Sequence, residues 1–323
     1  MQIVDTAGER LGLDVGPRRL RKLLIEGLAG EDRPGSDAEA TVLVRVERSR
    51  AAFPTYGWLP LTRGVRHDAG QVVLEDACGT GFDLHLAVAQ GRLVVTARWR
   101  PSARNRVAKM LLRSRFHLLV RAVLLQYPVL WWAGVQGRVP LHVGGLTLGS
   151  ATAVLSGPGG VGKSTLLARA VAHGCVTVGD NVCVSDGVSL WGLVEPLRTE
   201  QGDGRKMPHG RREALLPNRV QSLRPDQLLV LRRSRGTDFL VTPLDRDQAA
   251  RDLVCGTYAA GELRRYWSYA AVLAAGTGLG PPHPAVQDTC AQLVDSLRCQ
   301  TVTVPRLSAA DPSMLVACLE AAS

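Results

Sequence analysis

Aromatic residues are scarce in this sequence and make up 5% of its 323 residues. Proteins that bind single-stranded nucleic acid combine basic residues with exposed rings on which the bases stack. Here the basic residues are present, with a formal net charge of +10, but few rings accompany them. We therefore expect anionic partners other than nucleic acid. The alternative is that the excess of arginine reflects only the residue bias of a chain rich in Ala, Gly, Val and Arg.

The sequence also lacks cysteines at the spacing of a metal site or a redox motif. It has seven cysteines, an odd number, and no two of them are separated by two residues. Several lie in apolar runs, which is typical of reduced thiols buried in a cytoplasmic protein. We expect a cytoplasmic protein with neither a disulfide framework nor a zinc site.

A long uninterrupted apolar run is missing as well. The most apolar stretch, 118–135, contains Arg121, Gln126 and Pro128, whereas a membrane-spanning helix needs about 20 mostly apolar residues. The beginning of the sequence carries acidic side chains and no apolar core, so we expect no signal peptide. We interpret residues 118–135 as a helix that packs against protein, with Trp131 and Trp132 in the core, and we expect no membrane span.

Short strands followed by helices are predicted in the first 120 residues. Valine recurs at positions 42, 44 and 46, which predicts a half-buried strand. Turn residues separate further predicted strands at 71–74, 82–88 and 92–96. Between 104 and 132 apolar residues recur at helical spacing, which predicts one or two amphipathic helices. We expect a smaller α+β domain over residues 1–120.

The densest basic run of the chain lies at the start of this helical region, and no acidic residue interrupts it. Its members are Arg98, Arg100, Arg104, Arg106, Lys109, Arg113 and Arg115. A solvated helix face explains the run as well as an anion-binding surface does.

From residue 139 onward the pattern changes to strand, loop, helix and strand. Strands are predicted at 141–143 and 146–148 around a Gly144-Gly145 hairpin turn, and then at 151–155, 176–178 and 228–231. Helices are predicted at 164–173, ending before Gly174, and over 251–275. This order predicts an α/β nucleotide-binding domain over residues 121–323.

Residues 157–164, Gly-Pro-Gly-Gly-Val-Gly-Lys-Ser, fit the whole P-loop pattern G-x-x-x-x-G-K-[ST]. Glycines let consecutive N–H groups turn toward one anion, and the following helix directs its N-terminal dipole at the same phosphates. We expect Lys163 to reach the β- and γ-phosphates and Ser164 to bind Mg²⁺. The predicted nucleotide-binding residues are Gly157, Pro158, Gly159, Gly160, Val161, Gly162, Lys163, Ser164 and Thr165.

Asp180 follows the short apolar strand predicted at 176–178. The carboxyl ends of parallel strands face the ligand crevice of an open α/β sheet. Asp180 can therefore hold Mg²⁺ there or take the proton from an attacking hydroxyl. The alternative is that Gly179-Asp180-Asn181 is an ordinary turn.

The stretch 141–186 resembles the catalytic domain of HPr kinase/phosphorylase and its relatives. The resemblance rests on His142, the motif at 157–164 and Gly179-Asp180-Asn181. It implies a P-loop domain of the HPr kinase/PEP carboxykinase type that binds ATP and Mg²⁺. It also implies that Lys163 binds phosphate, that Ser164 binds the metal, and that Asp180 is the catalytic acid/base with His142 near the phosphates.

The same resemblance bears on the acceptor and on the assembly. Relatives in peptide natural-product pathways phosphorylate a serine of a peptide, and the family suggests a homo-oligomer. The second acid of the family's pair is Asn181 here, and an amide cannot accept a proton. We therefore expect a forward kinase with little of the reverse phosphorolysis.

Two weaker candidates lie downstream of Asp180. A basic loop carries Arg205, Lys206, His209, Arg211 and Arg212, and such a loop either closes over phosphates or holds the acceptor, or is a plain surface loop. Glu195 follows a predicted strand and is either a solvated acid at the strand end or a neighbour of the metal.

The sequence favours a kinase that transfers the γ-phosphoryl group of ATP to a hydroxyl of a peptide, a small protein or a small metabolite. The hydroxyl is expected to be that of serine, and the basic clusters favour an anionic acceptor. The alternative is a P-loop ATPase or GTPase that acts as a switch or assembly factor, although the chain has neither N/T-K-x-D nor LSGGQ. A nucleotide-binding module with a structural role is a third interpretation, which the intact Lys163, Ser164 and Asp180 disfavour.

Overall fold

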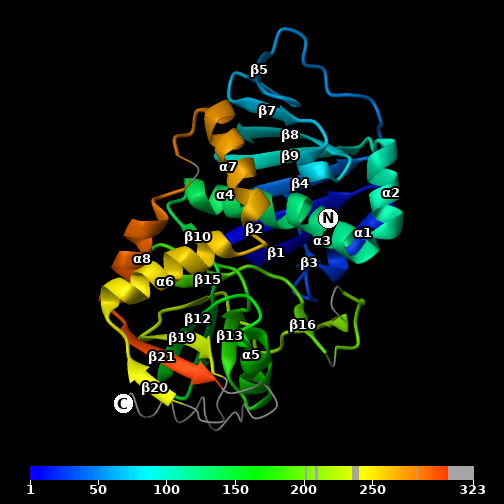
Figure 1. Cartoon of the computed structure of the whole chain (residues 1–323). Helices are drawn as coiled ribbons and strands as arrows, with labels where there is room; N and C mark the ends of the chain where they lie inside the picture. Colours follow the sequence, from blue (N-terminus) through cyan, green and yellow to red (C-terminus); the bar gives the residue numbers. More distant parts are fainter. Residues whose placement is uncertain (201, 208–209, 235–239, 282, 305–323) are drawn as a thin grey trace.

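The computed structural model describes residues 1–200, 202–207, 210–234, 240–281 and 283–304. Within these residues the protein is a mixed α/β structure with several sheets. Figure 1 shows a nine-stranded sheet in the upper part, coloured blue to cyan, and a six-stranded sheet in the lower part. In the nine-stranded sheet the strand order is β3-β1-β2-β4-β9-β8-β7-β6-β5. Its strands are β1 (Gln2–Thr6), β2 (Glu9–Val15), β3 (Arg33–Pro34), β4 (Val42–Glu47), β5 (Leu59–Thr62), β6 (Val65–Asp68), β7 (Gln71–Leu74), β8 (Phe82–Ala89) and β9 (Arg92–Trp99).

β4 is an inner strand of this sheet, with one face buried and the other buried only at Leu43. It pairs in parallel with β2 and with β9. Val42 and Val44 belong to the large core, whereas Leu43 packs with Ile3 and Ala40 in a small separate cluster. Successive side chains of a strand point to opposite faces, so this small cluster covers the second face at Leu43. The predicted strand is confirmed, with its valine face buried, as are those at 71–74, 82–88 and 92–96.

A long helical segment runs between residues 113 and 135 and follows α1 (Arg18–Glu26) and α2 (Ala103–Leu111) in the chain. It consists of α3 (Arg113–Arg121), a π-helical turn (Ala122–Gln126) and α4 (Tyr127–Val135). By length and composition it could cross a membrane, but 78% of its most apolar window is buried inside the protein. The two tryptophans of α4 are buried as well, which confirms the prediction of a core helix and is consistent with a soluble protein.

α7 (Arg264–Thr277) comes from far along the chain and packs on the N-terminal sheet against β5, β6 and β7. Its Tyr266, Tyr269 and Leu273 join the same core as the sheet and α4. At Gly276 a Cβ atom would lie 2.5 Å from Val72 Cγ2, so the close approach requires glycine. One core thus contains residues from both sides of position 120, where the sequence predicts a domain boundary.

The six-stranded sheet has the order β13-β11-β12-β19-β21-β20 and lies beside a four-stranded sheet, β10-β14-β15-β18, and a two-stranded pair, β16-β17. The strands are β10 (Val139–Leu141), β11 (Gly144–Leu148), β12 (Ala151–Ser156), β13 (Val176–Gly179), β14 (Cys183–Ser185), β15 (Leu190–Gly192), β16 (Leu197–Thr199), β17 (Arg212–Ala214), β18 (Ser222–Leu223), β19 (Gln227–Arg233), β20 (Leu240–Pro243) and β21 (Arg298–Val304). The helices of this part are α5 (Lys163–Ala172), α6 (Arg246–Ala259) and α8 (Val286–Asp295).

Two sequence predictions for this part are wrong. The hairpin expected at Gly144-Gly145 does not form, because β10 pairs with β14 and β11 pairs instead with β12 and β13. The single helix expected over 251–275 is two helices, α6 and α7, because Ala260 adopts an extended backbone at the end of α6. The strands predicted at 151–155, 176–178 and 228–231 and the helix that begins at the P-loop motif are confirmed.

The direction of the strands brings two distant segments to one edge of the sheet. β12, β19 and β21 are parallel, whereas β11 runs antiparallel to both of its neighbours, β12 and β13. β12 and β13 therefore run the same way, with one strand between them. Their carboxyl ends lie on the same edge, which places the loop after β12 and Asp180 after β13 on one side of the molecule.

The buried ion pair of Arg121 on α3 with Glu213 on β17 generates the first prediction. Both side chains are less than 10% exposed, and Arg121 Nε also donates to Leu23 O at 2.9 Å. Glu213→Ala leaves a buried guanidinium without its carboxylate, which should lower the free energy of unfolding by about 3–5 kcal/mol. Glu47→Ala, which removes an exposed partner of Arg98, is the control and should cost less than about 1 kcal/mol. Urea unfolding of both variants measures the difference, and equal losses would contradict the prediction.

Candidate active site

The loop between β12 and α5 is built from glycines with backbone angles that other residues rarely adopt. The φ angles of Gly157, Gly160 and Gly162 are 143°, 80° and 117°. A Cβ at Gly157 would lie 2.7 Å from Leu231 O on β19, so the loop can leave β12 there only with glycine. We call residues 157–162 the glycine-rich loop.

α5 begins at Lys163, and no side chain caps its N-terminus. The first amide groups of a helix have no acceptor inside the helix. Together with the helix dipole, these N–H groups make the end of the glycine-rich loop a favourable place for an anion.

Lys163 lies folded over this loop. Its side chain is buried, and Nζ donates to Gly157 O at 2.7 Å. Burial lowers the pKa of Lys163, while the charges of Asp180 and Glu262 act in the opposite direction. Within the described part of the chain Lys163 forms no ion pair with a carboxylate at 4 Å or less, so its charge is available to an anionic ligand.

Asp180 has a buried carboxylate oxygen that lacks a partner, although the residue as a whole is partly exposed. The Ser164 hydroxyl is close enough to lower the pKa of Asp180, but the Oδ1 atom is buried without any hydrogen-bond partner. Burial raises the pKa of Asp180 to about 6, and the nearby Glu195 adds to the rise, whereas Ser164, Lys163 and Arg198 oppose it. The carboxylate oxygen is thus positioned for a cation or a proton that the protein itself does not supply.

This arrangement fits a magnesium ion that is bound mainly by other ligands. No group of three or more His, Cys, Asp or Glu side chains among the described residues could hold a metal. Mg²⁺ in nucleotide sites needs only one or two protein ligands, because phosphate oxygens and water supply the rest. Ser164 Oγ and the unpartnered oxygen of Asp180 are such a pair.

A chain of polar contacts extends from Asn181 away from the loop. His142 Nε2 lies 3.2 Å from Asn181 Oδ1, and Asn181 Nδ2 donates to Glu195 Oε1 at 3.2 Å. Arg198 joins the chain by donating to Glu195 Oε2 at 2.8 Å and to Glu262 Oε1 at 3.3 Å. Asn181 adopts a φ of 79°, which this residue type tolerates better than most.

The pKa shifts of His142 and Glu262 indicate which of these two side chains is charged at neutral pH. Burial and the charge of Lys163 lower the pKa of His142, so its ring is neutral at neutral pH. Burial acts to raise the pKa of Glu262, but Arg198 holds it below its usual value.

The Glu195 side chain is only 10% exposed, and it is paired with Arg198 and hydrogen-bonded to Asn181. The interpretation of Glu195 as a solvated strand-end acid is therefore wrong. No sequence motif identified Arg198 or Glu262 as site residues. Arg198 lies on β16 and Glu262 in the connection between α6 and α7, so the two meet only in the folded protein.

Two pockets meet at this chain of contacts. One, of about 470 Å³, is lined by the start of the glycine-rich loop together with His142, β19 and the end of α6. The other, of about 380 Å³, is lined by Glu195, Arg198 and the helices α3, α4 and α7. Gly261 and Glu262 line both pockets.

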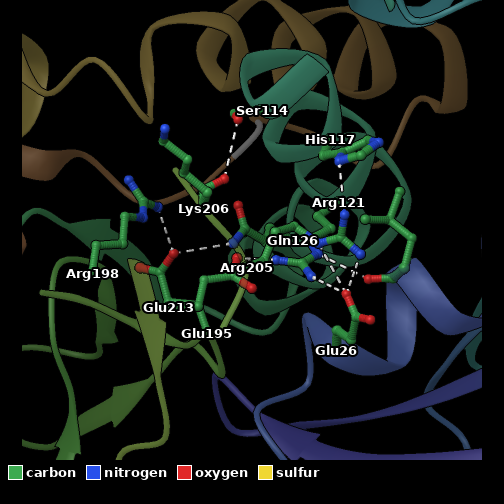
Figure 2. A network of polar contacts seen from close by, with 11 residues as sticks. Glu26, Ser114, His117, Arg121, Gln126, Glu195, Arg198, Arg205, Lys206 and Glu213 are labelled. Atoms are coloured by element: carbon green, nitrogen blue, oxygen red, sulfur yellow. Dashed lines mark hydrogen bonds and ion pairs between the residues drawn. The ribbon is translucent and has the colours of Figure 1, made fainter. Parts of the chain in front are cut away.

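The basic loop predicted as a lid or acceptor site lies on the second pocket's side. Arg205 Nε donates to Glu26 Oε2 at 2.9 Å, and its Nη1 lies 3.2 Å from His117 Nδ1 (Figure 2). Lys206 O accepts from Ser114 Oγ at 3.1 Å. None of the described basic residues of this loop lines the pocket beside the glycine-rich loop. Arg211 and Arg212 are exposed, and His209 lies outside the described residues, so the role of the loop stays a prediction.

Comparison with solved structures finds a distant likeness, whereas comparison of the sequence finds none. No protein-family model and no curated protein matches the sequence. Among solved structures, the chain is similar to the Hpr(Ser) kinase/phosphatase from Coxiella burnetii, with 10% sequence identity and a TM-score of 0.30. The similarity covers 57% of this chain and 95% of that chain. It indicates a distant structural relationship and no more.

The buried carboxylate of Asp180 generates a prediction about stability. Its pKa is about 6 in the folded protein and near 3.9 in an unfolded chain. The folded state therefore loses stability as the pH rises through this range, because the unfolded chain ionises Asp180 more easily. Asp180→Asn abolishes this titration, so without ligand it should be more stable than the parent at pH 8 by roughly 3 kcal/mol.

Chemical denaturation at pH 5 and pH 8 measures this effect. The advantage of Asp180→Asn should grow by about 1–2 kcal/mol between the two values. Asp14→Asn, which changes an exposed aspartate on β2, is the control and should show no such trend. An Asp180→Asn effect that is the same at both pH values would contradict a raised pKa.

Proposed function

We propose that this protein is an ATP-dependent kinase that transfers the γ-phosphoryl group to a hydroxyl, with serine as the preferred acceptor group. The observation that carries the proposal is the buried, unpartnered Asp180 oxygen beside Ser164 and Lys163 at the N-terminus of α5. A carboxylate, a hydroxyl, an ammonium and open N–H groups are the set that phosphoryl transfer requires.

Each group has a role in this proposal. The N–H groups of the glycine-rich loop and the Lys163 ammonium bind the β- and γ-phosphates. Ser164 Oγ and Asp180 would hold Mg²⁺, which when bound supplies charge neutralisation to the phosphates. His142 and Glu195 fix Asn181, which follows Asp180 directly and restricts its position.

The reaction needs one proton acceptor. The acceptor oxygen forms a bond to the γ-phosphorus while the bond from that phosphorus to the bridging oxygen breaks, and ADP leaves with the electron pair. Asp180 takes the proton of the acceptor hydroxyl. With a pKa of about 6, it is ionised at neutral pH and is a stronger base than an ordinary carboxylate. The second pocket, which adjoins Glu262, favours a kinase over a hydrolase because it offers space for an acceptor larger than water.

Removing the Lys163 ammonium tests the phosphate-binding role. Lys163→Ala should abolish phosphoryl transfer and weaken ATP binding at least tenfold, because the charge that meets the phosphates is lost. Labelled ATP with serine peptides and small hydroxyl compounds, read as intact mass, measures transfer, and calorimetry measures binding. Lys22→Ala, at an exposed position of α1, is the control. Activity within a few-fold of the parent, or ADP release without any phosphorylated acceptor, would refute the proposal.

Asp180 should matter for the rate and not for nucleotide affinity. Asp180→Asn is expected to lower the catalytic rate at least 1,000-fold and to change the affinity for ATP titrated without Mg²⁺ little, because a base acts in the transition state. In the parent protein kcat/KM, which reports the pKa values of the free enzyme, should fall about tenfold for each pH unit below about 6, where Asp180 becomes protonated. A pH–rate profile that is flat from pH 8 to pH 5 would show that the base lies elsewhere.

A further inference from the structure

The lining of the second pocket combines apolar and charged side chains. Leu118, Leu119 and Leu125 of the α3–α4 segment contribute apolar surface with Tyr127 and Val194. The charged lining residues are three glutamates and five arginines, namely Glu195, Glu213, Glu262, Arg115, Arg121, Arg198, Arg264 and Arg265. A ligand that matches this lining carries an apolar portion next to a charged group.

The positive charge of this pocket is not balanced. Arg121 pairs with Glu213, and Arg198 pairs with Glu195 and Glu262. Arg115, Arg264 and Arg265 form no ion pair within the described part of the chain, and all three are exposed. Arg264 is also the first residue of α7, whose N-terminus has no side-chain cap, so the helix dipole adds to the positive charge there.

Two further observations indicate a deficit of negative charge at this place. Burial and the charges of Arg205, Arg113, Arg121 and Lys109 lower the pKa of His117 to about 4. Arg121 Nη2 is buried without a hydrogen-bond partner, and its contact with Glu26 Oε2 is as long as 3.6 Å. Figure 2 shows Arg121 beside His117, with Arg205 sharing the Glu26 carboxylate.

The pocket is continuous with the candidate active site. Gly261 and Glu262 line both pockets. Arg198 spans the boundary, since it binds Glu262 and Glu195, and Glu195 accepts from Asn181, the residue after Asp180. Glu195 of the second pocket is therefore linked to Asp180, the group that is proposed to receive the proton, through the side chain of Asn181.

We infer that this pocket binds the phosphoryl acceptor, and that the acceptor carries a carboxylate or phosphate group beside an apolar portion. Arg115, Arg264 and Arg265 hold the anion, the leucines contact the apolar portion, and the hydroxyl reaches toward Asp180. The inference rests on the proposed kinase function, because nucleotide hydrolysis by a switch or assembly factor requires no second organic substrate.

The inference is tested by measuring how tightly small acids bind, each in comparison with an uncharged analogue that serves as its neutral partner. N-acetyl-L-leucine is compared with N-acetyl-L-leucinamide, and phenyl phosphate with phenol, by calorimetry at low ionic strength. At least one acid should bind at least tenfold more tightly than its neutral partner, and that acid identifies the anion. In Arg264→Ala/Arg265→Ala its dissociation constant should rise at least fivefold, whereas Arg264→Lys/Arg265→Lys should stay within threefold of the parent.

The matched control is Arg246→Ala, since Arg246 is exposed and begins α6 as Arg264 begins α7. It should leave binding of the acid within twofold of the parent. Acids that bind no better than their neutral partners, or an unchanged constant in Arg264→Ala/Arg265→Ala, would overturn the inference. ATP is titrated separately into the same variants and should bind equally to all of them. A parent protein that binds the acids but not ATP would instead refute the kinase function.

Discussion

The charge of the Asp180 carboxylate, held away from water, is the constraint to which the surrounding groups respond. A buried carboxylate needs partners, and here one of its oxygens has none. Lys163 and Arg198 reduce the resulting electrostatic penalty, while Glu195 increases it even though Arg198 pairs with it. The site thus contains a net unfavourable interaction that a bound cation or a proton would relieve. Such arrangements are found where a protein binds or transforms a ligand more often than in plain structural turns.

The N-terminal sheet takes part in building this site although none of its strands reaches the glycine-rich loop. α7 is fixed on β5, β6 and β7, with Gly276 against Val72. The connection just before α7 carries Gly261 and Glu262, which line both pockets. Arg121 on α3 similarly ties α1 to β17. The positions of Glu262 and Glu213 therefore depend on packing around a core that is distant from Asp180 in the sequence.

The sequence predicts those parts of the site that belong to a contiguous motif or follow directly on a recognisable strand. The residues 157–164 follow a contiguous pattern, and Asp180 ends an apolar strand, so both segments could be assigned before the fold was known. The two segments lie close together because β12 and β13 run in the same direction. A parallel sheet was expected to give this arrangement, and it is found here even though β11 lies between the two strands and is antiparallel to both. Arg198 and Glu262 could not be predicted, because they become neighbours only through tertiary packing. The break between α6 and α7 had a weak signal in Gly261, whereas the pairing of β10 with β14 had none.

The π-helical turn at Ala122–Gln126 shows how one residue can change what a helix presents. An α-helix advances by about 100° per residue, so a turn that contains one extra residue offsets the faces before and after it. Before the turn, α3 has exposed arginines at 113 and 115. At the end of the turn Gln126 donates to Glu195, and directly after it the Tyr127 hydroxyl donates to Glu262 O. The extra residue therefore acts as a phase shift between α3 and α4, and Arg115 before the turn, Leu125 within it and Tyr127 after it all line the second pocket.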